Sequence, residues 1–142
     1  VPGVVGALGQ PPGIGNRRTI VTFAGVTMQP IPLGAFAMGS GKLALGSDDD
    51  EAKHQAVISA DYWLAATEVT RAQWQRVMGD EPWLRLGGDE PADGVDLAAL
   101  PATGIPWSAA VAFCERVTER ERLEGRLPRD YVYCLPTEAQ WE

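Results

Sequence analysis

Cysteine and histidine are scarce in this sequence, and the common catalytic motifs are missing. The 142 residues include two cysteines, Cys114 and Cys134, and one histidine, His54. The two cysteines do not form a C-x-x-C metal motif, and one pair does not define a disulfide framework. The sequence also has no P-loop, G-x-G-x-x-G motif, G-x-S-x-G elbow or Ser-His-Asp order. The residues by themselves therefore indicate no active site and leave the cellular compartment open.

Long apolar runs and clusters of basic residues are absent as well. No apolar stretch approaches the roughly 18 residues of a membrane-spanning helix. Residues 1–47 carry three basic and no acidic residues, whereas residues 48–142 carry nine basic and nineteen acidic ones, for a net charge of −7. Nucleic acids and anionic membranes both require a basic surface on their partner. We therefore expect neither a nucleic acid partner nor a membrane span.

The histidine follows an acidic run, a combination that raises the question of a metal site. His54 comes after Asp48, Asp49, Asp50 and Glu51. The run lacks the D-x-D-x-D-G spacing and the later glutamate of a calcium loop. One histidine also supplies no second nitrogen ligand for a transition metal. We expect a solvent-exposed acidic loop followed by a packed or capping histidine.

The two cysteines differ in their predicted surroundings. Cys114 shares the apolar stripe of a predicted helix with Val111 and Val117, with Phe113 beside it, and a cysteine in such a place behaves as a small buried hydrophobe. Burial raises the pKa of a thiol and makes it inert, which favours core packing, or a disulfide to a partner outside this chain, over a reactive thiol. Cys134 lies in a predicted strand, without a histidine or helix start nearby to activate it. The roles of both residues stay open.

Glycine and proline divide the chain into short strands. Residues 1–18 are predicted to form a linker or an N-terminal arm, and the domain begins at residue 19. Pro30 and Pro32 favour edge or turn positions between strands. Residues 80–104 are predicted to be a long surface loop. The predicted strands cover residues 20–23, 26–28, 35–38, 55–59, 62–65 and 131–135, and those at 55–59 and 62–65 are expected to pair.

Two helices are predicted from their caps and periodicity. The first has Thr70 as its N-cap, Gln73 as the capping-box partner and Gly79 at its end. The second is expected to begin with Ser108 as its N-cap and to end at Gly125. Its charged half, residues 115–124, is predicted to face solvent and to form i,i+3 and i,i+4 ion pairs.

A third helix begins just before the sequence ends. Thr137 and Gln140 form another capping box, and fewer than two helical turns remain before Glu142. Isolated helices shorter than about 12 residues are marginally stable in water. We interpret the sequence as the N-terminal portion of a larger domain.

Five segments occur in a recognisable order over residues 20–142. Together they resemble the formylglycine-generating enzyme family, also called the sulfatase-modifying factor domain. Lys53, Cys134 and Gln140 depart from the family pattern, which has Pro, Arg and Glu at these positions, although Gln140 preserves the capping box. The segments are Ile31 to Ser40, Asp49 to Val57, Tyr62 to Trp74, Pro101 to Cys114 and Leu135 to Glu142.

This resemblance implies an α+β, C-type-lectin-like fold with two main helices and short irregular strands, of which residues 19–142 are the N-terminal portion, incomplete at the C-terminus. Active family members oxidise a cysteine of a sulfatase polypeptide to formylglycine, using oxygen and copper held by a pair of cysteines. That pair and the family's calcium sites lie in the C-terminal half of the domain, and neither Cys114 nor Cys134 matches them. The resemblance thus assigns no catalytic, cofactor-binding or metal-binding residue here and implies an inactive chain.

A rival interpretation is a non-catalytic ligand- or protein-binding module. The C-type-lectin-like fold is widely reused for binding, and a fold alone does not fix a function. A scaffold domain attached to another enzyme is a third interpretation.

Overall fold

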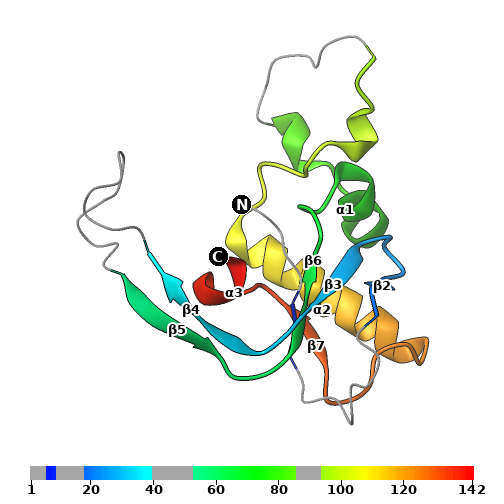
Figure 1. Ribbon diagram of the computed structural model, residues 1–142. Coiled ribbons are helices and arrows are strands. Elements are labelled where there is room, and N and C mark those ends of the chain that lie inside the picture. Colours follow the sequence, from blue (N-terminus) through cyan, green and yellow to red (C-terminus); the bar gives the residue numbers. More distant parts are fainter. Residues whose placement is uncertain (1–5, 9–17, 40–52, 86–93) are drawn as a thin grey trace.

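A long, bent β-hairpin is the main feature of the fold (Figure 1). The computed structural model describes residues 6–8, 18–39, 53–85 and 94–142. Strands β3 and β6 pair in one half of the hairpin, which we call the inner arm, and strands β4 and β5 pair in the other half, the outer arm. Both pairs are antiparallel. These strands are β3 (Thr27–Ile31), β4 (Gly34–Met38), β5 (His54–Ile58) and β6 (Tyr62–Ala65).

The bend separates strands that we expected to pair. Strand β5 pairs with β4, from Gly34 opposite Ile58 to Met38 opposite His54, and not with β6. The predicted pairing of residues 55–59 with 62–65 is therefore wrong. Both strands belong to the same side of the hairpin, and the residues between them form its corner instead of a tight turn. Asp61 stabilises this corner, because its Oδ1 accepts a 2.7 Å hydrogen bond from the Leu33 N–H.

A five-stranded antiparallel sheet extends the inner arm of the hairpin, in the order β2-β3-β6-β1-β7. Strand β1 (Gly6–Leu8) belongs to the segment predicted as a linker or arm, and it lies between β6 and β7 (Val132–Cys134). Strand β2 (Ile20–Val21) is shorter than predicted, because a turn follows in which Gly25 has φ = +85°. Pro30 lies within β3, beyond the last residue of β3 that pairs with β2, so its missing N–H falls at an edge.

Helix α1 (Arg71–Met78) has the predicted caps. The Thr70 hydroxyl accepts from the Gln73 N–H, the Gln73 side chain accepts from the Thr70 N–H, and Gly79 takes a left-handed conformation. The segment 80–104, predicted as a surface loop, contains regular structure in the parts that are described. They include the 3₁₀ helices η1 (Pro82–Arg85) and η2 (Leu97–Ala99), and the Trp83 side chain is buried.

Helix α2 (Trp107–Leu123) begins before the predicted N-cap. Pro106, and not Ser108, occupies the cap, with φ = −68°, and its carbonyl accepts from the N–H groups of Ala109 and Ala110. A proline fits there because its φ is preset and its absent N–H would be unsatisfied at a helix start. The predicted end is confirmed, since Gly125 has φ = +71°. Within the described residues, no helix is long and apolar enough to cross a membrane.

The hydrophobic core lies between the five-stranded sheet and the two longer helices. Phe113, Cys114 and Val117 of α2 are almost fully buried in it, as the apolar stripe predicts, whereas Val111 is half-buried. The rings of Trp74 and Phe113 stack with centroids 5.3 Å apart. None of the residues of β4 or β5 belongs to this core cluster. The outer arm of the hairpin therefore packs separately from the main body.

Candidate functional site

Helix α3 (Glu138–Trp141) lies inside the bend of the hairpin and forms a groove with its corner (Figure 1). The groove has a volume of about 480 Å³ and mostly apolar walls. Leu33 and Trp141 remain 57% and 50% exposed, so large apolar surfaces are open to solvent there. Its described lining residues are Ile31, Pro32, Leu33, Gly34, Ala35, Phe36, Ile58, Tyr62, Leu64, Ala139, Gln140, Trp141 and Glu142.

Two hydrogen bonds hold α3 against the hairpin. The predicted capping box is present, since Thr137 and Gln140 exchange backbone and side-chain hydrogen bonds. The Tyr62 hydroxyl donates a 2.7 Å bond to the Gln140 carbonyl, and the Gly39 N–H donates a 3.1 Å bond to the Glu142 carboxylate. The helix is thus fixed to both arms of the hairpin, to β6 and to the end of β4.

The groove offers binding surface but little reactive chemistry. Of the described residues that line it, Tyr62 and Glu142 are the ones whose side chains ionise. Burial raises the pKa of Tyr62 above its usual value, so the phenol stays protonated at neutral pH and serves as a hydrogen-bond donor. The Glu142 carboxylate already accepts from a backbone N–H. The arrangement suits an apolar segment of a ligand.

The two cysteines lie away from this groove, between α2 and β7. Cys114 is 3% exposed, which confirms the prediction that it packs in the core. Burial, followed by the nearby Cys134, raises its pKa to about 12. Cys134 is half-buried, and burial raises its pKa as well. Both are thiols in this structure.

His54 stands at the start of β5, opposite Met38 of β4, and its side chain is exposed. The acidic run at positions 48–51 lies outside the described residues. Among the residues that are described, no group of three or more His, Cys, Asp or Glu side chains is arranged to hold a metal ion.

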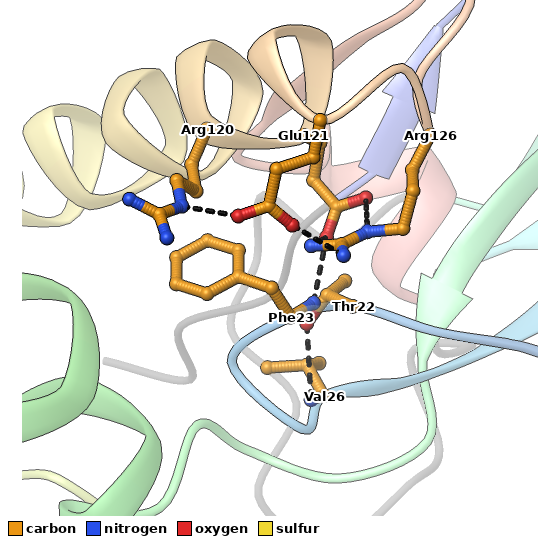
Figure 2. A network of polar contacts seen from close by, with 7 residues as sticks. Thr22, Phe23, Val26, Arg120, Glu121 and Arg126 are labelled. Atoms are coloured by element: carbon orange, nitrogen blue, oxygen red, sulfur yellow. Dashed lines mark hydrogen bonds and ion pairs between the residues drawn. The ribbon is translucent and has the colours of Figure 1, made fainter.

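Helix α2 contains a buried carboxylate, Glu121, whose burial the sequence did not predict (Figure 2). Glu121 is 3% exposed, although it belongs to the charged half of the helix that we expected to face solvent. Its carboxylate accepts a 2.6 Å bond from the Phe23 N–H and bonds of 3.0 and 3.2 Å from Arg126. Arg120 pairs with Glu124 at i,i+4, as predicted for this helix, and Arg126, which follows the helix, also pairs with Glu124. Because its oxygens already accept from these donors, Glu121 is a structural anchor between α2 and the β2–β3 turn.

No local signal could have identified Glu121 as buried. Its partner Phe23 is 98 positions away in sequence, and the surrounding run of alternating acids and arginines is typical of an exposed helix face. The groove was missed for the same reason, since it joins segments more than 100 residues apart.

The described residues define a small mixed α/β domain, with short antiparallel sheets and a bent hairpin carrying a helix at its corner. The family described as Sulfatase-modifying factor enzyme 1-like domain matches residues 22–142. The chain belongs to this family, as the resemblance predicted. No curated protein sequence and no solved structure matches the chain.

Proposed function

We propose that this chain is part of a domain that oxidises a cysteine of a sulfatase polypeptide to formylglycine, and that the domain has a C-type-lectin-like architecture. The observation that carries the proposal is the family match over residues 22–142, which includes every described element from β3 onward. The link to formylglycine generation is a property of the family. The specific role of this chain is inferred from its own residues.

The thiols of this chain do not fit the copper site that the family implies. Copper is bound by thiolates that a metal can reach. Cys114 is buried in the core with its pKa raised to about 12, and the pKa of Cys134 is raised by burial. Both therefore stay protonated at neutral pH. We assign no step of the oxidation to them, and no calcium ligands to the described carboxylates.

In this proposal the described residues serve the structure of the domain and the binding of its substrate. The hairpin and α3 shape an open apolar groove of about 480 Å³, where an extended polypeptide segment could bury apolar side chains. The exposed side chains of Leu33 and Trp141 would supply apolar contact area. In this proposal the groove helps to hold the sulfatase polypeptide, while the reacting groups belong elsewhere in the complete domain.

An activity assay tests the first part of the proposal. The 142-residue chain is incubated with a Cys-x-Pro-x-Arg peptide, oxygen and copper, and the conversion of thiol to aldehyde is followed by mass spectrometry and hydrazide labelling. We expect no aldehyde from this chain alone. Aldehyde formation above a copper-only control would show that the residues present suffice for catalysis and would overturn the assignment.

A binding module is the second candidate, and the open groove favours it. The same peptide is titrated while tryptophan fluorescence is recorded, with Trp141→Ala and Trp107→Ala compared. Both tryptophans are exposed, but only Trp141 lines the groove. Weakened binding in Trp141→Ala alone would support the groove as the binding surface. Equal binding by both variants would argue against it.

A further inference from the structure

Side chains of α2 occupy the outer edge of β7. Strand β7 is the last strand of the sheet, with β1 on its other side. The Arg122 Nη2 donates a 2.9 Å bond to the Tyr131 carbonyl, and the Tyr133 N–H donates a 2.9 Å bond to Thr118 Oγ1. Strand β7 runs back along the helix after the turn at Gly125 (Figure 1). Helix and strand edge are therefore in direct contact.

The two hydrogen bonds define a register between helix and strand. Moving from Arg122 to Thr118 goes back four residues on α2, about 6 Å, and moving from Tyr131 to Tyr133 advances two residues on β7, about 6.6 Å. The distances nearly match, so the next step places Cys114 at the level of Leu135. Cys134 then lies between this level and the level of Thr118. Within α2, the Thr118 hydroxyl also donates a 2.9 Å hydrogen bond to the Cys114 carbonyl, one turn earlier in the helix.

The face of β7 that carries Cys134 is also in contact with the helix. Side chains alternate along a strand, so Cys134 shares its face with Val132. Val132 lines a groove of about 410 Å³ together with Glu115, Thr118 and Glu119 of α2. The influence of Cys134 on the pKa of Cys114 agrees with this proximity, since charges act on a thiol only over short distances.

We propose that Cys114 and Cys134 form a disulfide on oxidation, which links the middle of α2 to β7. Cys134 reacts first because it is half-buried, whereas Cys114 is buried. With oxidised glutathione as the oxidant, the Cys134 thiolate attacks one sulfur of the glutathione disulfide and releases a glutathione thiolate. The Cys114 thiol then gives up its proton, its sulfur attacks the Cys134 sulfur of the mixed disulfide, and the second glutathione is released. Two protein thiols become one disulfide, their two protons pass to the two displaced glutathione thiolates, and one oxidised glutathione becomes two reduced ones.

The disulfide would close a chain segment that contains the last turns of α2, the Gly125 turn and most of β7. Cross-linking such a segment restricts the unfolded chain and raises stability when the native geometry is kept. The bond would therefore act on the same helix–strand contact that Thr118 and Arg122 already maintain. It would also make the stability of the domain depend on the redox conditions around it.

The test oxidises the native 142-residue chain with glutathione disulfide and maps its tryptic peptides. Trypsin places Cys114 in the peptide of residues 86–116 and Cys134 in that of residues 130–142. We expect these two peptides to be linked in the monomeric protein, with the loss of two hydrogens and an upward shift in Tm that dithiothreitol reverses. Glutathione retained on Cys134 without the linked peptide would overturn the proposal. So would a link that forms only in urea or only between two chains.

Two variants separate the proposed route from nonspecific oxidation. Cys114→Ala should retain glutathione on Cys134, because no second thiol is present to displace it. Cys134→Ser should remain unmodified, because Cys114 is buried. Modification of Cys114 in native Cys134→Ser at the rate of the unaltered protein would contradict the order of attack. The linked-peptide result on the unaltered chain needs neither variant to fold.

Discussion

At the scale of single residues, Glu121 is a buried charged side chain on which stability should depend. Its carboxylate is buried, with a side chain 4% exposed, and accepts hydrogen bonds from the Phe23 N–H and from Arg126, whose side chain is 43% exposed. Glu121→Gln keeps the shape but replaces one accepting oxygen with an NH₂ group that faces these donors. We expect a loss of about 2 kcal/mol in the free energy of unfolding, the usual value for hydrogen bonds to a charged group. Urea denaturation measures it.

Glu119→Gln is the matched control for this variant. Glu119 lies on the same helix but is exposed, so its substitution should change stability by less than about 0.5 kcal/mol. Equal urea midpoints for the two variants would mean that burial of Glu121 contributes nothing, in disagreement with its contacts.

The raised pKa values of Cys114 and Tyr133 predict that the domain loses stability at alkaline pH. Burial raises the pKa of each to about 12, from 9.0 for the thiol and 10.0 for the phenol. The unfolded chain then releases these protons at lower pH than the folded chain does. Their contribution to stability is complete below about pH 9 and is lost as the pH rises toward about 12. Urea denaturation across this range should show a steady decline.

Comparison of Cys114→Ala with Val117→Ala isolates the thiol. Both variants remove buried core atoms, but only the first removes a titrating group. We expect a shallower decline with pH in Cys114→Ala and an unchanged slope in Val117→Ala. Parallel slopes in the two variants would show that Cys114 does not titrate as its burial implies.

At the scale of the elements, the turn after α2 depends on one glycine. The Gly125 N–H donates to the Arg122 carbonyl, and the Arg126 N–H donates to the Glu121 carbonyl, the pattern of a Schellman motif. Gly125 has φ = +71°, and a Cβ added there would meet no atom within 4 Å. Gly125→Ala should therefore cost about 1 kcal/mol from backbone strain alone. Thermal or urea unfolding measures the difference.

Gly34→Ala provides the control for backbone strain. A Cβ at Gly34 also meets nothing within 4 Å, but its φ lies outside the left-handed region. We expect this variant to be neutral or slightly stabilising, because alanine reduces the freedom of the unfolded chain. A similar loss in both variants would point to a cause other than φ.

The elements also show which features a sequence can reveal. The caps at Thr70, Gly79, Gly125 and Thr137 depend on residues three or four positions apart, so their local chemistry predicted them. The predicted start of α2 was two residues too late. Serine is the better side-chain cap, so Ser108 was chosen over Pro106, which occupies the N-cap position. The pairing of β5 was missed because alternation in a strand does not specify its partner.

At the scale of the whole molecule, the outer arm of the hairpin and the main body differ in how they are held. The core cluster includes residues of β3, β6, β7, α1 and α2 but none of β4 or β5. Met38 and Ala56 of the outer arm are buried outside that cluster. The arm is held by its own ladder, by α3 and by the Tyr62–Gln140 and Gly39–Glu142 hydrogen bonds. Such a unit can open locally while the body stays folded.

Hydrogen exchange should therefore separate the two regions. Amides of the β4–β5 ladder should exchange at least about tenfold faster than those around Val117 in α2, since 1.4 kcal/mol less protection gives this ratio. Tyr62→Phe removes the hydroxyl that donates to Gln140 and should speed exchange in the arm, while the rates in α2 stay unchanged. A parallel rise in both regions would indicate that the arm opens only when the whole domain unfolds. Because the groove lies between the hairpin and α3, faster opening in Tyr62→Phe should also weaken the binding of any ligand in the groove.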